Sequence, residues 1–316
     1  MVWFPFVFIG LGVLIGFLRL PGKFFALAES VGNIVLISMM FAIGVNIGAS
    51  DTVIQNFGVI GLQCVVITCC AVIMSVFAVF ALEKTVLPLN TLKEKMASKN
   101  LSVSSEVKTG GDLGKKSPPL AWIIPVFIFM GVFTGFFLPK NSAWLVDSVF
   151  DGSLAVLYVS VGVGLAQNRH VFFYVKLIGW KIALISAATV FGSLVGGLLA
   201  GVVLRIPLHI SVLSACGMCY YSLTGAFMTQ VYGINIGAYG FLVNVLRELM
   251  TILALPVFIR ISQGAPIALG GAANMDTTLV PVTKYVGAEL GLVALITGTI
   301  LTFVVPLLLP LLSNIF

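Results

Sequence analysis

Two acidic residues in the C-terminal third of the chain, Glu248 and Asp276, lie in segments that are otherwise apolar. Glu248 is about 12 residues from either end of a stretch long enough to cross a bilayer, so its carboxylate is expected near the bilayer centre. A charge there costs about 3 kcal/mol or more, and such charges usually mark the path of a substrate or a proton. Because carboxylates bind protons and ammonium groups, these residues predict the binding and release of small cations.

Arg247 precedes Glu248 and offers it an internal ion pair. Neighbouring residues on a helix point about 100° apart and pair poorly, however. A role in transport is therefore favoured over a purely structural pair. Asn244 lies one helical turn before Glu248 and shares its face.

Asp276 lies in a glycine-loosened segment, Leu269-Gly-Gly-Ala-Ala-Asn-Met-Asp-Thr-Thr, where a helix is expected to break. An unwound segment inside a bilayer exposes carbonyl groups and helix N-terminal amides, and the amides suit a carboxylate. Asp276 could instead cap the helix that follows, and the two roles are compatible. Asn274 and Thr277 are the other polar candidates in this segment.

A second interrupted segment, Ala215-Cys-Gly-Met-Cys-Tyr-Tyr-Ser-Leu-Thr-Gly225, supplies hydroxyl groups and glycines that can line a polar site. Its contact candidates are Tyr221, Ser222 and Thr224. The five cysteines lie in apolar segments without the spacing of a disulfide framework. No metal site and no cofactor are predicted.

The composition determines what solvent surrounds these residues. The chain is 59% hydrophobic and 9% charged, which is too little polar surface for a water-soluble domain. Its mean hydropathy is +1.15. The formal charge is +6, and the one dense basic segment is residues 83–118, where seven Lys face four acidic residues. That pattern is typical of a topology signal and not of a nucleic-acid surface, so no nucleic-acid partner is expected.

The predicted fold is an all-α polytopic membrane protein with about eight transmembrane helices plus two broken or re-entrant helical segments, 207–232 and 263–285. With the N-terminus outside, most Lys and Arg outside the helices face the cytoplasm, and both termini face outward. The apolar runs that can cross are 2–20, 30–49, 57–82, 119–138, 147–166, 172–204, 236–260 and 286–313.

Internal repeats organise these elements. Gly12 recurs as Gly131 and Gly44 as Gly162, at offsets of 119 and 118. Each copy holds three crossings, so the second is inverted relative to the first, which is typical of secondary transporters. The predicted divisions are a first three-helix repeat (1–82), a flexible basic cytoplasmic loop (83–118), an inverted repeat (119–204) and a core (205–316). A shorter repeat at an offset of 54 relates Gly233, Gly237 and Pro256 to Gly287, Gly291 and Pro310.

Three motifs in the last 100 residues closely resemble the LysO-type lysine exporter family. They are Gly217-Met-Cys-Tyr-Tyr-Ser-Leu-Thr-Gly225, Leu246-Arg-Glu-Leu249 and Gly271-Ala-Ala-Asn-Met-Asp-Thr-Thr-Leu279. The resemblance implies an L-lysine exporter of the cytoplasmic (inner) membrane, driven by proton entry. It also implies intramembrane carboxylates at Glu248 and Asp276.

The function predicted is a secondary active transporter that exports L-lysine or a similar cationic amino acid by proton antiport. Its partners would be this substrate, protons and the lipid bilayer, and a homodimer is compatible with the sequence. A Na⁺-coupled or channel-like transporter of another small solute is the alternative. An intramembrane enzyme is disfavoured because the chain has neither an H-E-x-x-H nor a G-x-S-x-G motif.

Overall fold

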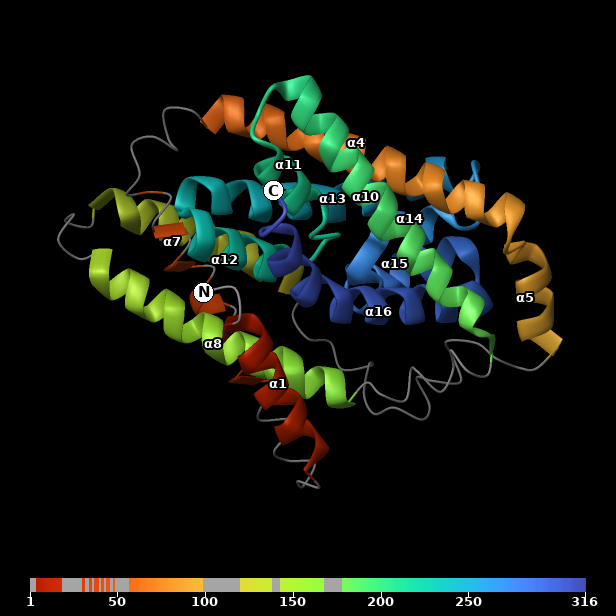
Figure 1. The fold of residues 1–316 in the computed structure, drawn as a ribbon, viewed down its shortest axis with the longest axis horizontal. Coiled ribbons are helices and arrows are strands. Elements are labelled where there is room, and N and C mark those ends of the chain that lie inside the picture. The colour runs from red at the N-terminus through yellow and green to blue at the C-terminus, as the bar shows by residue number, and fades with distance from the viewer. Residues whose placement is uncertain are drawn as a thin grey trace. The chain divides into compact units, whose positions relative to one another are not determined.

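The computed structural model of the chain describes residues 4–18, 57–98, 120–137, 143–167 and 178–316, together with single positions between 30 and 48. Every regular element in these residues is a helix, and Figure 1 gives the helices with their labels. In a bilayer a helix satisfies its own backbone hydrogen bonds, which explains why apolar segments adopt this form. The predicted all-α class is therefore confirmed for the part of the chain that the structure describes.

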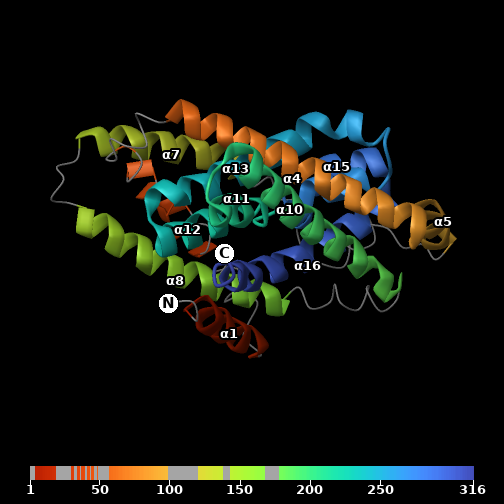
Figure 2. The same ribbon diagram turned by 45° about the horizontal axis from the view of Figure 1, so that its top comes forward.

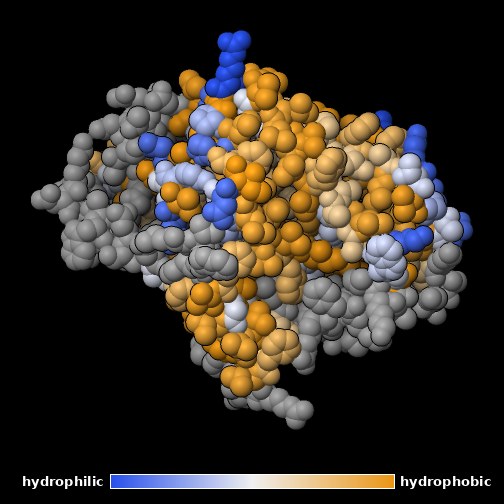
Figure 3. All heavy atoms as spheres, viewed as in Figure 1, coloured by the Kyte–Doolittle hydropathy of each residue, from blue (hydrophilic) through white to orange (hydrophobic). Residues whose placement is uncertain are grey.

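Four helices among the described residues are long and apolar enough to cross a membrane. Figure 3 shows hydrophobic residues along the course of one of them, α10, as expected of a helix that faces lipid. The chain is a multi-pass membrane protein. The four are α4 (Phe57–Thr85), α10 (Ala183–Leu204) preceded by the 3₁₀ turn η2 (Trp180–Ile182), α13 (Ile234–Phe258) and α16 (Ala288–Leu312).

Three further apolar helices coincide with predicted crossings in the first half of the chain. They are α1 (Phe4–Phe17), α7 (Leu120–Phe137) and α8 (Ala143–Gln167). Within the predicted crossing 30–49, the positions that the structure describes are all helical.

The chain forms two compact units, and each unit combines segments from both predicted three-helix repeats. Unit 1 consists of Met1–Leu62, Lys116–Arg169 and Ser222–Tyr239. Unit 2 consists of Gln63–Lys115, His170–Tyr221 and Gly240–Phe316.

Glycines bring helices into close contact within unit 1. A Cβ at Gly12 of α1 would lie 2.9 Å from the Cα of Gly162 in α8, which is closer than two carbon atoms can approach. A Cβ at Gly131 of α7 would lie 3.0 Å from the Cα of Gly44. Small residues of this kind let helix backbones touch in lipid, where no hydrophobic effect drives association.

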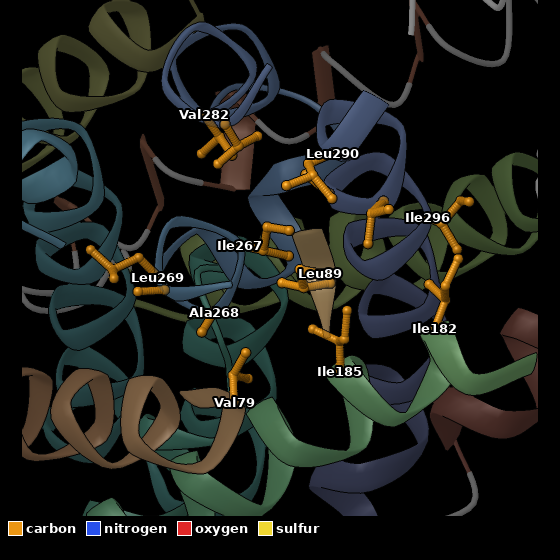
Figure 4. Close-up of a cluster of buried hydrophobic side chains, with 14 of the residues drawn as sticks. Val79, Leu89, Ile182, Ile185, Ile267, Ala268, Leu269, Val282, Leu290 and Ile296 are labelled. Atoms are coloured by element: carbon orange, nitrogen blue, oxygen red, sulfur yellow. The ribbon is translucent and has the colours of Figure 1, made fainter. Parts of the chain in front are cut away.

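Unit 2 contains α10 packed along α4, side by side in both Figure 1 and Figure 2. A Cβ at Gly196 of α10 would lie 2.6 Å from the Cα of Ala71 in α4. Beside them a hydrophobic cluster gathers side chains from several helices, including Val79, Leu89 and Ile267, and Figure 4 shows these side chains together. This cluster surrounds the second broken segment.

Both predicted interruptions are present. In the first, α11 (Leu208–Ala215) ends, and α12 (Tyr221–Tyr232) begins after a turn in which Met218 and Cys219 have φ angles of 47° and 74°. In the second, the short helix α14 (Ala265–Gly270) is followed by the 3₁₀ helix η3 (Gly271–Met275) and then α15 (Leu279–Val286). The glycines and polar residues of these segments do break the helices, as expected.

The prediction of a flexible loop over residues 83–118 is wrong for the first part of this range. Helix α4 continues to Thr85, and residues Leu89–Ser98 form a further helix, α5. Leu89, Leu92 and Met96 of α5 are buried in the hydrophobic cluster of unit 2. Their burial stabilises this helix, which was not predicted because the segment is rich in lysine.

Candidate functional site

The tips of the two broken segments meet in unit 2. The backbone amide of Ala272 donates a hydrogen bond of 2.9 Å to the carbonyl of Met218, and the Cys219 thiol lies 3.7 Å from the carbonyl of Leu269. Gly271 has a φ of 53°, and a Cβ there would lie only 2.6 Å from the Met218 oxygen. Glycine is therefore required at this position, both for its backbone conformation and for the approach of the two segments.

Asn244 holds the first tip from the adjacent helix α13. Its side-chain oxygen accepts a hydrogen bond of 2.8 Å from the backbone amide of Cys219. Its amide group donates to the carbonyls of Ser214, at 2.9 Å, and Gly240, at 2.7 Å. These bonds use most of what a buried Asn side chain can make, so Asn244 maintains the break in the helix.

Arg247 occupies the interior of unit 2, with none of its surface exposed. Its guanidinium lies 2.8 Å from the Ser193 hydroxyl and 3.4 Å from the Ser75 hydroxyl. It also donates to three backbone carbonyls at the ends of the half-helices α11 and α14. These carbonyls belong to Ala215, Ala268 and Leu269, at 3.5, 3.1 and 3.4 Å.

The carbonyl end of a helix carries partial negative charge, which a cation stabilises. In this arrangement Arg247 neutralises the ends of both half-helices. The sequence had suggested Arg247 as a substrate or proton ligand. In the structure its side chain is fully buried and is not accessible to a solute.

Glu248 and Asp276 lie close enough for their charges to interact. Glu248 is buried, with 7% of its surface exposed, and its carboxyl group shares a hydrogen bond with the side chain of Thr277. Asp276 is exposed. The Tyr221 hydroxyl is within electrostatic range of both carboxylates, and its ring packs edge-on against Phe241 at 5.8 Å. One buried and one accessible acid thus lie beside the second break.

Asn274 has a mainly structural environment. Its side-chain amide donates to the carbonyl of Ile267 at 2.7 Å, and its oxygen accepts from the Thr278 hydroxyl at 3.0 Å. Gly298 of α16 makes room for it, since a Cβ there would lie 2.9 Å from the Asn274 Cβ. Asn274 therefore fixes the shape of the tip that carries Asp276.

The other sequence-predicted candidates divide between the two units. Ser222 and Thr224 are buried in unit 1, whereas the rest of the predicted set belongs to unit 2. Sequence reasoning missed Ser75 and Ser193, which bond to Arg247 and to each other. Their separation of 118 residues equals the repeat offset, which is the signal that could have identified them. Among the described residues there is no cluster of His, Cys, Asp and Glu suited to a metal ion.

Comparison with known proteins identifies relatives that match about half of the chain. A protein of Escherichia coli (strain K12) named "Lysine exporter LysO" is 31% identical over 156 residues, which are 49% of this chain and 52% of that protein. A protein of Haemophilus influenzae (strain ATCC 51907 / DSM 11121 / KW20 / Rd) named "Putative lysine exporter" is 26% identical over 161 residues, 51% of this chain and 82% of that protein.

The chain thus spans about half the length of the E. coli relative that it matches. No solved structure matches the chain. The family profile described as "Lysine exporter LysO" matches residues 125–313, more than half of the chain, and includes all the residues of the two broken segments. By this match, the chain belongs to the LysO lysine exporter family.

Proposed function

We propose that this chain is a secondary transporter of the cytoplasmic (inner) membrane that exports L-lysine by proton antiport. The observation that carries the proposal is the interacting pair Glu248 and Asp276 beside a broken helix. Two carboxylates in a region of low dielectric constant repel each other, so binding a cation lowers the energy of the pair. A proton and a lysine ammonium group are both suitable cations, and competition between them couples their movements.

The two acids have different access, which suggests an order of events. Asp276 is exposed and would meet the substrate ammonium first, whereas Glu248 is buried and would hold the proton or the second contact. Exporting one net positive charge against an inside-negative potential costs about 2.3 kcal/mol per 100 mV. Entry of protons through the same pair would offset that cost.

We also infer that residues 1–82 and 119–204 are copies of inverted topology. Ser75 and Ser193, which are 118 residues apart, share a hydrogen bond of 3.0 Å. A residue touches its own counterpart only where a two-fold axis passes between the copies. The counterparts of Gly12 and Gly44 are Gly131 and Gly162. In unit 1, Gly12 contacts Gly162 and Gly131 contacts Gly44, so exchanging the two copies turns one contact into the other. This reciprocity supports a two-fold relation.

The shorter repeat supports the same inference. Met218 and Ala272, which share a backbone hydrogen bond, are 54 residues apart. Helices α13 and α16 begin and end at residues separated by the same offset. The glycines that precede them, Gly233 and Gly287, have φ angles of 86° and 95°. A common two-fold axis would bring the two tips together, which is where inverted-repeat transporters bind their substrates.

Efflux of radiolabelled L-lysine from proteoliposomes tests the proposed function. An inward proton gradient should accelerate wild-type efflux, and replacing Na⁺ by choline should have no effect. Glu248→Gln and Asp276→Asn should each lower the proton-driven rate by about 100-fold, since each removes one of the cation-binding carboxylates. Glu94→Gln, at an exposed position of α5, is the matched control and should behave as wild type. Proton-driven efflux that survives in Glu248→Gln would refute the mechanism.

A further inference from the structure

The two ends of the second broken segment lie against one corner of unit 2, formed by the end of α4 and the first turns of α5. We call residues 83–93 the α4–α5 corner. A Cβ at Gly264, just before α14, would lie 3.1 Å from the Leu89 side chain. At the other end, a Cβ at Gly287 would lie 3.1 Å from the Lys93 ammonium nitrogen. Leu89 and Lys93 are one turn apart on α5, so residues 264–287 form a hairpin that begins and ends at the same place.

Opposite charges of the corner bind the two ends of this hairpin. The Glu83 carboxylate accepts a hydrogen bond of 3.2 Å from the backbone amide of Gly264, at the start of α14. The Lys93 ammonium donates a hydrogen bond of 3.2 Å to the carbonyl of Val286, the last residue of α15. Each charge has the sign that stabilises the helix end it touches, because helix N-termini favour anions and C-termini favour cations.

Apolar packing joins the same surfaces. Leu89 is 1% exposed and belongs to the hydrophobic cluster that also contains Ile267 of α14 and Val282 of α15, and Figure 4 shows these side chains around one interior. A Cβ at Gly264 would lie 2.8 Å from Val79 of α4, so the start of the hairpin is in close contact with α4 as well. The corner thus holds both ends of the hairpin by charge and by packing. Asp276 belongs to the hairpin and lies between these ends in the sequence.

We propose that Glu83 and Lys93 are positioning residues for transport, which fix the ends of the hairpin and so hold Asp276 beside Glu248. The role in transport rests on the proposed function, but the contact with the hairpin does not. Glu83 bonds to the backbone amide of Gly264 and Lys93 to the backbone carbonyl of Val286, so both act through the backbone at the ends of α14 and α15.

Hydrogen exchange tests the contact separately from transport. We would measure backbone amide exchange of the purified full-length chain in nanodiscs for wild type, Glu83→Met, Lys93→Met and the double variant. Exchange in residues 264–287 should become about tenfold faster in the double variant, because both ends of the hairpin are released. Exchange in α10 should stay unchanged. Glu94→Met, the exposed neighbour on α5, is the matched control and should leave the hairpin as in wild type.

Transport measurements then test positioning. The lysine concentration at half-maximal efflux should rise about tenfold in Lys93→Met, and Lys93→Arg, which keeps the charge and a donor, should restore it. If the double variant fails to fold, the single Lys93 variants decide the question by the same two measurements. Hairpin exchange at the wild-type rate in Lys93→Met, or an equal effect of Glu94→Met, would overturn the proposal. A wild-type chain that moves no lysine would refute the proposed function and leave the exchange result valid.

Discussion

The surroundings of Arg247 explain how a cation can be stable inside an apolar protein. The guanidinium has five oxygen acceptors: the hydroxyls of Ser75 and Ser193 and three carbonyls at the ends of α11 and α14. A buried ion is tolerated when hydrogen bonds satisfy its donors, and removing it leaves its partners unsatisfied. Arg247 therefore matters to the folded structure around the acids, apart from any contact with substrate.

We predict that Arg247→Met lowers the free energy of unfolding by about 3 kcal/mol, since three carbonyls and two hydroxyls lose their donor. Arg247→Lys should cost less, because an ammonium group can bond to some of these acceptors. Thermal unfolding in detergent, followed by circular dichroism, measures both effects. The control is Arg260→Met, at an exposed position after α13, which should unfold as wild type does. Equal melting of Arg247→Met and wild type would contradict this account.

At the residue scale the sequence predicted the two acids as site residues but not the groups that surround them. Charges are rare in the apolar runs, so Glu248 and Asp276 stood out, and the structure brings them within electrostatic range. The groups that support the acids are common residue types that do not stand out in the sequence. Ser75 and Ser193 are hydroxyls inside helices, and only the fold brings them together with Arg247. The role of such residues depends on tertiary contacts that no local pattern records.

At the scale of elements the helix breaks were predictable, because glycine and polar residues interrupt the hydrophobic pattern within a few residues of the observed ends. Helix α5 was not predicted, although its buried residues Leu89, Leu92 and Met96 are spaced by three and four, as on one face of a helix. The ten residues of α5 are mostly polar, so their sequence alone resembles that of a linker. The cluster that buries them consists mostly of residues far away in the sequence.

The contact of η3 with α16 yields a prediction about an element. Gly298 faces η3, and a Cβ there would lie 2.7 Å from the carbonyl carbon of Asn274, so Gly298→Ala must displace the tip. We expect a loss of stability of about 2 kcal/mol, in line with other overpacked positions. The melting temperature of the purified chain measures it. Gly61→Ala on α4, where nothing lies within 4 Å of the added methyl, is the control and should melt as wild type does.

A smaller shift in melting for Gly298→Ala than for Gly61→Ala would show that η3 yields to the methyl group without cost. The same variant also tests the link between stability and function. The tip holds Asp276, so a displaced η3 should slow lysine efflux even at temperatures where the chain is fully folded.

At the scale of the whole molecule, the proposed inverted repeat makes a prediction about the two membrane surfaces. The α4–α5 corner and the turn after α10 should lie on opposite sides, because three predicted crossings, α7, α8 and α10, separate them along the chain. By the positive-inside rule, the excess of Lys near the corner predicts that it faces the cytoplasm. Glu94 and Arg205 are both exposed, so each can be replaced by a cysteine that reagents can reach.

In a background with the five native cysteines replaced, a membrane-impermeant maleimide added to intact cells should label Arg205→Cys and not Glu94→Cys. Permeabilised cells should label both, which controls for reactivity. Phe316→Cys, at the exposed C-terminal residue, should follow Arg205→Cys, because an odd number of crossings separates each of them from the corner. Labelling of Glu94→Cys and Arg205→Cys from the same side would require an even number of crossings between them, and a pseudo-two-fold relation between the two three-helix copies would then be impossible.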